Sequence, residues 1–221
     1  MIETADDSEI MFMTDSARIF ILSAPSGTGK TTVIRALLDE LGDRVFFSVS
    51  ATTRPPRPSE REGVDYFFYT PKRFEGAIER GEFLEYASVY GQYYGTPKDP
   101  VIKALAKGRQ VLLDIDWQGA RQVCKRLPSV VTIFLLPPSQ AELERRLRGR
   151  RTEALDQVSR RLKDAAREMR HWHDFDHVVV NDRIRETVRQ IHAIMDDPSG
   201  APAGPEDLKQ RIDELLAPRT E

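Results

Sequence analysis

The stretch with the clearest capacity for chemistry is Ser23–Thr32, which reads SAPSGTGKTT. Its two glycines, Gly27 and Gly29, let the backbone curl until successive N–H groups point inward, the arrangement that holds phosphate oxygens. The side chain of Lys30 can then reach the β- and γ-phosphates, and the hydroxyl of Thr31 can hold Mg²⁺. The stretch therefore predicts a loop that binds a nucleoside triphosphate. The residues assigned to this loop are Ala24, Pro25, Ser26, Gly27, Thr28, Gly29, Lys30, Thr31 and Thr32.

The sequence on either side supplies the elements that such a loop needs. Residues 18–22 form a short apolar run typical of a buried strand, and Gly42 ends a helical pattern that begins near Lys30. The apolar positions of that pattern are Val33, Ile34, Leu37, Leu38 and Leu41. The usual motif starts with glycine, where this chain has Ala24, but a small Cβ at the entrance leaves the later N–H groups accessible. A turn that merely happens to carry a lysine is the alternative, and the strand and helix argue against it.

Composition limits the class of protein. The 221 residues suggest one domain with room for a smaller inserted lobe, and the net charge of -2 argues against nucleic acid as a partner. No apolar run is long enough to span a bilayer, so we expect no membrane partner. Residues 1–16 read as a flexible arm without the features of a signal peptide, and Cys124 is the only cysteine. These features predict a cytoplasmic protein.

Further elements follow in the chain. Strand patterns occur at 45–50, 63–69, 82–86, 111–116, 130–136 and 178–180, and helical patterns lie between most of them. We interpret Gly91–Thr96 as a tight turn that carries aromatic residues. The short β elements between the second and third core strands are too many for a simple crossover, so they predict a small inserted lobe. Asp197–Pro205 reads as a linker, and the apolar stripe after it predicts a terminal helix that docks on the core, mediates self-association or frays.

Two groups of polar residues lie where parallel strands are expected to end. Arg54 and Arg57 follow one strand on a stiff proline-rich loop, either as ligand contacts or as ordinary surface arginines. Asp114 and Asp116 lie at the end of another predicted strand. A carboxylate in this position commonly orients Mg²⁺ and its waters, or it caps the helix that follows.

Two clusters of basic or imidazole side chains are more ambiguous. The run 145–151 fits a nucleic-acid patch, a solvated helix end, or a lid of arginines that closes on phosphates. His171, His173 and His177 crowd together, but without further metal-ligand spacing we assign them no metal site.

A series of short motifs resembles the guanylate kinase family of nucleoside monophosphate kinases over roughly residues 18–195. The motifs are SAPSGTGKT at 23–31, SATTRPPR at 50–57, GVDY at 63–66, EFLE at 82–85, YYGT at 93–96, LDIDWQG at 113–119 and VND at 180–182. The resemblance implies an α/β fold with a three-layer parallel-sheet P-loop core, an inserted mixed-β lobe for the nucleoside monophosphate, and a helical lid bearing arginines. It implies transfer of the γ-phosphoryl group of ATP to GMP, and to dGMP, with Mg²⁺ as cofactor.

The resemblance also implies roles for individual residues. The residues that grip the GMP phosphate would be Arg54, Arg57, Tyr66 and Tyr94, and those that read guanine would be Ser50, Glu85, Thr96 and Asp116. Asp114 would act in the water network of Mg²⁺. Arg150 and Arg161 match the lid arginines that contact ATP phosphates, with Arg146 a weaker match, and Asn181 and Asp182 fall where the adenine end of ATP is held.

The resemblance places the domain boundaries as follows. The kinase-like domain would span 17–195, with its core at 17–50 and 97–195, the GMP lobe at 51–96 and the lid at about 139–165, followed by the linker and short helix at 196–221. Arg151 departs from the bacterial pattern, in which glycine often follows the first lid arginine. We expect the tail beyond Asp197 to affect stability or assembly rather than chemistry.

Three alternative functions remain open from the sequence. One is a catalytically inactive guanylate-kinase-like interaction domain, although Lys30, Thr31 and Asp114 are all in place here. Another is a different P-loop kinase such as a ribose bisphosphate kinase, which the proposed guanine readers argue against. RNA binding through the arginine run is disfavoured by the near-neutral charge.

Overall fold

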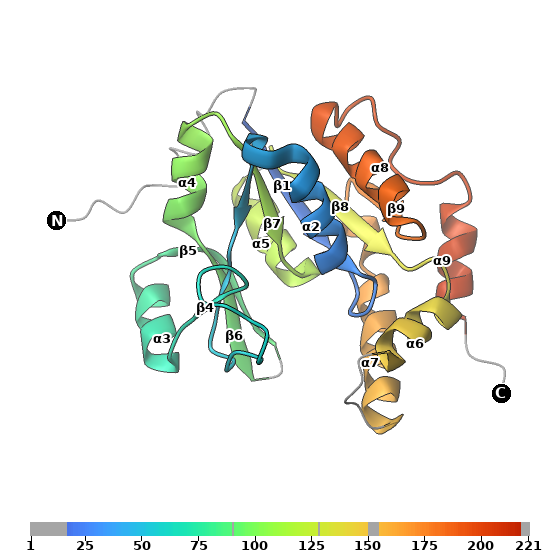
Figure 1. Cartoon of the computed structure of the whole chain (residues 1–221), viewed down its shortest axis with the longest axis horizontal. Helices are drawn as coiled ribbons and strands as arrows, with labels where there is room; N and C mark the ends of the chain where they lie inside the picture. The colour runs from blue at the N-terminus through green and yellow to red at the C-terminus, as the bar shows by residue number, and fades with distance from the viewer. Residues whose placement is uncertain (1–16, 90, 128, 150–154, 218–221) are drawn as a thin grey trace. The chain divides into compact units, whose positions relative to one another are not determined.

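A computed structural model describes residues 17–217 except 90, 128 and 150–154. The chain forms two sheets (Figure 1). The five-stranded sheet has the order β2 (Val45–Ser48), β7 (Gln110–Asp114), β1 (Ile19–Ser23), β8 (Val131–Leu136) and β9 (His177–Val180). The four-stranded sheet has the order β4 (Phe67–Phe68), β3 (Ala51–Thr52), β6 (Gln92–Pro97) and β5 (Phe83–Val89). The expectation of an α/β fold with a parallel core sheet and a smaller mixed sheet is confirmed.

The chain divides into two compact units. Unit 1 holds the described residues up to Ile21 and Leu41–Val131, and unit 2 holds Leu22–Glu40 and the described residues from Thr132 onward. The separate GMP lobe at 51–96 stays a prediction, since its strands share a unit with β2 and β7.

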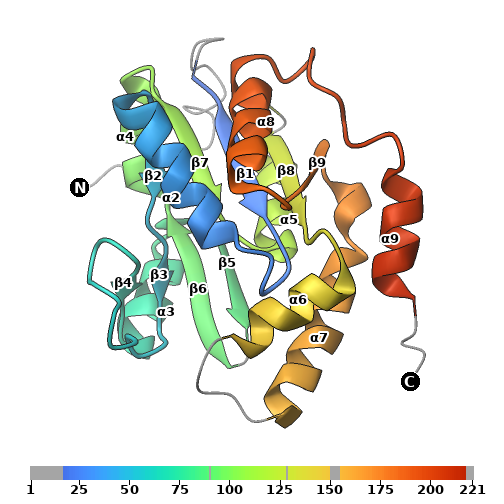
Figure 2. The ribbon, with the colours of Figure 1, turned by 45° about the vertical axis from the view of Figure 1, so that its right-hand side comes forward.

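Unit 1 alternates strands with short helices. The helices are η1 (Gly42–Arg44), α3 (Pro71–Glu79), α4 (Lys98–Ala106) and α5 (Trp117–Arg126). Thr70 begins α3 by accepting a hydrogen bond from the N–H of Arg73, and Pro71 supplies a favourable first residue. In the mixed sheet β3 is parallel to β4 and antiparallel to β6. The longer strands β5 and β6 are antiparallel neighbours (Figure 2).

The mixed sheet and α3 share an aromatic core. The ring of Phe74 stacks on Phe83 with centroids 4.5 Å apart, and on Tyr93 with centroids 5.3 Å apart. A Cβ at Gly95 would lie 3.0 Å from atoms of both Phe74 and Phe83, so this strand position needs a glycine. Packing of this core fixes the positions of β5 and β6, which carry several candidate site residues.

Unit 2 surrounds β8 and β9 with helices. They are α2 (Lys30–Leu41), α6 (Gln140–Arg148), α7 (Leu155–Met169), η2 (Trp172–Asp174), α8 (Ile184–Asp196) and α9 (Leu208–Leu216). The strands β8 and β9 are parallel, and the N–H of Asn181 donates to the carbonyl of Leu136 just beyond the last strand pair. Asn181 is thereby fixed at the end of the sheet.

The terminal helix α9 is part of the core of unit 2. Its side chains Ile212 and Leu215 are buried with Leu143 of α6 and with Val158 and Met169 of α7. The side-chain amide of Gln140 donates to the carbonyls of Leu215 and Ala217, at 2.7 and 2.9 Å. Of the alternatives that the sequence left for the tail, the structure shows docking onto its own unit.

Two local expectations are wrong. Gly91–Thr96 is not a tight turn: β6 begins at Gln92 and pairs with β5, and only Gly91, with φ of 75°, has turn geometry. The predicted strand at 63–69 is reduced to β4 and one isolated bridge between Glu62 and Tyr66. Among the described residues, no helix combines the length and the apolar character that a membrane span requires.

Candidate functional site

The loop predicted to bind phosphate lies between β1 and α2. Gly27 has φ of 90° and Gly29 has φ of 99°, backbone conformations that side chains rarely tolerate. The N–H of Thr28 closes a turn on the carbonyl of Pro25 at 3.2 Å, and the N–H of Val33 donates to Gly29 at 3.1 Å as α2 begins. The positive end of the α2 dipole therefore lies at Lys30, where it favours an anion.

Both loop glycines are also in close contact with the rest of unit 2. A Cβ at Gly27 would lie 2.8 Å from Leu147 of α6, and a Cβ at Gly29 would lie 2.8 Å from the side-chain nitrogen of Asn181. The loop thus packs directly against α6 and against Asn181 at the end of β9. The conformation of the loop is therefore determined by these packing contacts as well as by its own turns.

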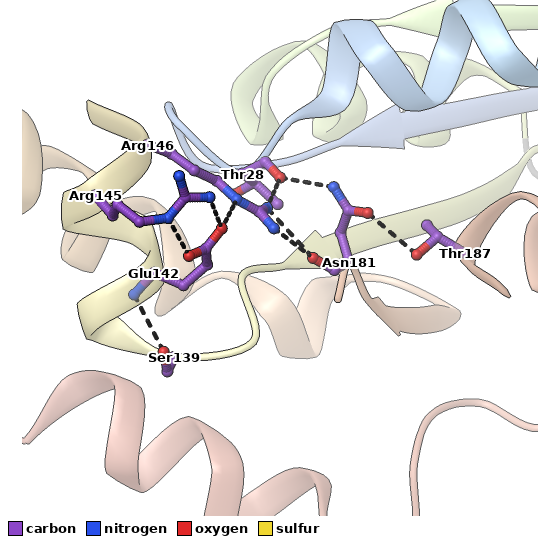
Figure 3. Close-up of polar contacts among 7 residues, drawn as sticks. All are labelled: Thr28, Ser139, Glu142, Arg145, Arg146, Asn181 and Thr187. Carbon is purple, nitrogen blue, oxygen red and sulfur yellow. Dashed lines mark hydrogen bonds and ion pairs between the residues drawn. The ribbon is translucent and has the colours of Figure 1, made fainter. Parts of the chain in front are cut away.

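Two side chains hold one carbonyl of the loop (Figure 3). The carbonyl oxygen of Thr28 accepts from Asn181 Nδ2 at 2.7 Å and from Arg146 Nη1 at 2.7 Å. The same guanidinium donates to the carbonyl of Asn181 at 3.2–3.3 Å. The hydroxyl of Thr187 lies within hydrogen-bond distance of Asn181 Oδ1, at 3.1 Å, and of the carbonyls of Arg183 and Val180, at 3.2 and 3.4 Å.

The start of α6 explains why Arg146 faces the loop. Ser139 accepts from the N–H of Glu142, and Ser-x-x-Glu is a capping pattern that begins a helix at this point (Figure 3). Glu142 accepts from Arg146 Nε at 2.7 Å and from Arg145. Hydrogen bonds from Arg145 and Arg146 hold the pKa of Glu142 down at about 2. The carboxylate is therefore ionised and orients Arg146.

A carboxylate of α7 also touches the loop. Glu168 Oε2 accepts from the N–H of Ser26 at 3.1 Å. Ser26 is therefore tied to the helix that also carries the predicted lid residue Arg161, which is half-buried on α7. Of the other residues assigned to ATP, Asp182 is exposed after β9, and Arg150 lies outside the described residues.

The described arginines at the end of α6 are balanced by glutamates of the same helix. Arg145 and Arg146 pair with Glu142, and Arg148 pairs with Glu144. This pairing removes most of the positive charge that a nucleic-acid patch would need.

In unit 1 a buried carboxylate faces a buried hydroxyl. Glu85 of β5 is 4% exposed and accepts from the hydroxyl of Thr96 at 2.7 Å. A Cβ at Gly119 would lie 2.6 Å from Glu85 Oε2, so the glycine leaves space for this carboxylate. Burial, aided by the negative charge of Asp116 and opposed by the bond from Thr96, raises the pKa of Glu85 to about 7.

The other two predicted guanine readers, Asp116 and Ser50, make hydrogen bonds that support the local fold. Asp116 caps α5: one of its oxygens accepts from the N–H of Gly119 at 2.9 Å and the other from the side chain of Gln118 at 3.2 Å. The capping alternative therefore applies, and a role in reading guanine stays a prediction. The carbonyl of Ser50 accepts from the N–H of Phe67 at 2.9 Å, beside the start of β3.

Three of the four predicted phosphate ligands lie together in unit 1. The guanidinium of Arg54 lies 5.5 Å from the ring centroid of Tyr66, and the ring centroids of Tyr66 and Tyr94 are 6.1 Å apart. Burial, with the charge of Asp114 second, raises the pKa of Tyr66 to about 12, so its hydroxyl stays a donor. Arg57 is exposed, and its backbone N–H donates to Glu60 beside this cluster.

The sequence did not reveal a counter-ion in this cluster. Glu60 accepts from Arg54 Nη2 at 2.8 Å and from the N–H of Arg57 at 2.7 Å. Burial opposes ionisation of Glu60, but these hydrogen bonds outweigh it and keep its pKa below the usual value. A phosphate that binds Arg54 must therefore compete with an ionised carboxylate.

Each unit carries one of the two residues assigned to Mg²⁺. Thr31 is exposed in the first turn of α2 and offers a hydroxyl, and Asp114 is half-buried at the end of β7. Within the described part of the chain, no cluster of three or more His, Cys, Asp or Glu side chains could hold a metal. Taken singly, each of these oxygen donors suits an ion whose other ligands are phosphate oxygens and waters.

Sequence reasoning missed Glu60, Thr187 and Glu168, which contact the candidate site residues Arg54, Asn181 and Ser26. The signal for Gly119 was present in the LDIDWQG motif, but its reason, the close approach of Glu85, needed the structure.

Comparisons with known proteins agree on one family. The family model for guanylate kinase matches residues 16–198. The guanylate kinase of Haemophilus ducreyi is 47% identical over 178 residues, which cover 80% of this chain and 86% of that protein. The guanylate kinase of Coxiella burnetii is 48% identical over 181 residues, covering 81% and 87%. The crystal structure of guanylate kinase from Anaplasma phagocytophilum matches with a TM-score of 0.70 and 34% identity, over 91% of this chain and 96% of that one.

Proposed function

Because the chain belongs to the guanylate kinase family, we propose that it transfers the γ-phosphoryl group of ATP to GMP, and to dGMP, releasing ADP and GDP or dGDP. The observation that carries the choice of base is the buried pair of Glu85 and Thr96. Guanine presents N–H donors at positions one and two beside an acceptor at position six. An ionised carboxylate matches the donors and a hydroxyl can donate to the acceptor, whereas adenine has the opposite polarity.

The binding roles divide between the two units. In unit 1, Arg54, Tyr66 and Tyr94 would hold the GMP phosphate with charge-assisted and phenolic hydrogen bonds, with Arg57 joining them. Ser50 and Asp116 would complete the reading of the base. In unit 2, residues 24–32 would hold the ATP phosphates.

The chemical step needs little covalent help from the protein. The attacking oxygen of GMP is already anionic, so the protein must bring two negatively charged groups in line and exclude water. Lys30 and the lid arginines Arg150 and Arg161 would stabilise charge on the transferred group. Bound Mg²⁺, held by Thr31 and through water by Asp114, would neutralise charge on the phosphates. The single cysteine, Cys124, fits a cytoplasmic location.

Turnover with ATP and a panel of GMP, dGMP, AMP, CMP and UMP tests this function. We expect rapid use of GMP and dGMP and little use of the others. Lys30→Ala should lower kcat by orders of magnitude while the Kd for GMP stays within about twofold, because the lost charge acts on the transferred group. Equal use of AMP and GMP would contradict the guanine assignment, and near-normal turnover of Lys30→Ala would contradict the phosphate-loop mechanism.

A further inference from the structure

The contacts of the Thr28 carbonyl fix the direction of the next N–H group. The carbonyl of Thr28 and the N–H of Gly29 belong to one planar trans peptide, in which they point in opposite directions. Asn181 and Arg146 each donate to this carbonyl at 2.7 Å and occupy both of its lone pairs. While both bonds persist, the N–H of Gly29 must point away from Asn181, toward the inner side of the loop.

We propose that Asn181 is a positioning residue of the phosphate-binding loop, which holds the Thr28 carbonyl outward so that the N–H of Gly29 faces the phosphates of the bound nucleotide. This proposal rests on the proposed function for the identity of the nucleotide. It replaces the expectation that the Asn181 side chain holds the adenine end of ATP.

The surroundings of Asn181 support positioning rather than ligand contact. The residue is 5% exposed. Its amide nitrogen donates to the carbonyl of Thr28, and its amide oxygen is the nearest of three acceptors around the hydroxyl of Thr187, which is itself 1% exposed. The orientation of the amide is unambiguous, because a carbonyl can only accept and therefore must face the NH₂ group.

The close approach to Gly29 makes the contact specific to this loop. A Cβ at Gly29 would collide with Asn181 Nδ2, so the amide packs directly against the glycine whose N–H it orients. The flexibility that lets Gly29 adopt φ of 99° would also let its peptide turn over. Two donors on one carbonyl prevent that rotation.

The test compares ligands with and without a base. Asn181→Ala should bind ATP, GTP and inorganic tripolyphosphate, each with Mg²⁺, about tenfold more weakly than the unmodified protein, the effect of one buried hydrogen bond. The loss should be equal for the three ligands because all use the N–H of Gly29. Calorimetry gives the three values of Kd, and the Kd for GMP should not change.

Two further substitutions keep the test independent of folding defects. Asn181→Asp conserves the shape of the side chain but places a carboxylate oxygen against the carbonyl of Thr28. It should therefore weaken the binding of tripolyphosphate more than Asn181→Ala does. Thr187→Val removes the hydroxyl that orients the amide and should weaken ATP and tripolyphosphate equally, by several fold. Thr187→Ser restores the hydroxyl and should restore both affinities.

The outcomes separate this proposal from the proposed function. A loss confined to ATP, with tripolyphosphate unaffected, would overturn the proposal and assign Asn181 to the adenine. Unchanged binding in both Asn181→Asp and Thr187→Val would overturn it as well. If the unmodified protein does not phosphorylate GMP, the proposed function fails, while equal losses for ATP and tripolyphosphate still support positioning.

Discussion

At the scale of single residues, we expect Glu85, as a proposed reader of guanine, to couple the binding of GMP to the loss of a proton. Its pKa of about 7 in the ligand-free protein means that it is largely protonated below neutral pH. The donors of guanine need the carboxylate, so binding must remove the proton. We expect the Kd for GMP to be about tenfold higher at pH 6 than at pH 8, since one proton must be released at the lower pH.

The phosphate of GMP titrates near pH 6 as well, so a control must separate the two groups. Glu85→Gln cannot titrate but keeps the contribution of the phosphate. Binding of GMP at pH 6 can be measured by calorimetry in two buffers of different ionisation enthalpy. The unmodified protein should release up to one more proton on binding GMP than Glu85→Gln does. Equal proton release by the two proteins would refute the prediction.

The same raised pKa predicts how stability depends on pH. A group whose pKa is higher in the folded state than in the unfolded state stabilises the folded state at pH values below its unfolded pKa. This contribution to stability is lost as the pH rises through the folded pKa. For Glu85 the loss falls between about pH 4.5 and 7. In the absence of ligand, the melting temperature of the unmodified protein should fall more over this pH range than that of Glu85→Gln.

Residue types and spacing were informative where a residue touches its chain neighbours or a ligand. Gly27, Gly29 and Lys30 could be placed on a phosphate-binding loop because the flanking strand and helix are local patterns. The contacts of Arg146 and Glu168 with that loop span 118 and 142 residues in sequence, and nothing local marks them. Among the described arginines of the run, the helical phase that starts at the cap Ser139 brings the guanidinium of Arg146 to the loop.

At the scale of elements, the cap of α6 gives Arg145 and Arg146 different tasks. Both pair with Glu142, but only Arg146 among these two is seen to donate to the loop carbonyl of Thr28. We expect Arg146→Ala to raise the KM for ATP about tenfold or more, because a charge-assisted hydrogen bond to the loop is lost. Arg145→Ala serves as the matched control and should stay within about twofold, as exposed ion pairs contribute little.

Steady-state kinetics at fixed GMP distinguish the two variants, and the KM for GMP should be unchanged in both. Similar losses in Arg145→Ala and Arg146→Ala would mean that the charge of the helix surface matters, and not the bond to the loop.

Element boundaries were harder to predict where aromatic residues and glycines alternate. Gly91–Thr96 looked like a turn because it contains two glycines. In the structure Gly95 is a strand residue that makes room for Phe74, a reason that depends on α3 and not on the local sequence. Packing across the sheet decided the outcome.

At the scale of the whole molecule, the tail is a structural part of unit 2. The sequence suggested that residues beyond Asp197 matter little for chemistry, and the structure adds that α9 buries Ile212 and Leu215 against the helices α6 and α7. Truncation would therefore expose apolar surface on the two helices assigned to the lid. A point substitution tests this role more cleanly because it leaves the chain length unchanged.

Leu215→Ala removes a side chain that is 5% exposed, next to the carbonyl that anchors Gln140. Large-to-small changes in a core cost about 2–5 kcal/mol, and the lower end applies at a peripheral helix. For a protein of this size that corresponds to a fall in melting temperature of roughly 4–8 °C. Asp213→Ala, on the exposed side of α9, is the control and should change it by less than about 1 °C, as surface substitutions usually do.

Ligands show which unit the substitution affects. By the proposed roles, ATP binds residues of unit 2, and a ligand stabilises the part of the fold that binds it. In calorimetric scans of Leu215→Ala, saturating ATP should therefore raise the melting temperature toward that of the unmodified protein more than GMP does. kcat should fall by no more than about twofold at temperatures well below the transition, since α9 supplies no group to the proposed chemistry. A large loss of kcat in a folded Leu215→Ala protein would instead make α9 a determinant of lid function.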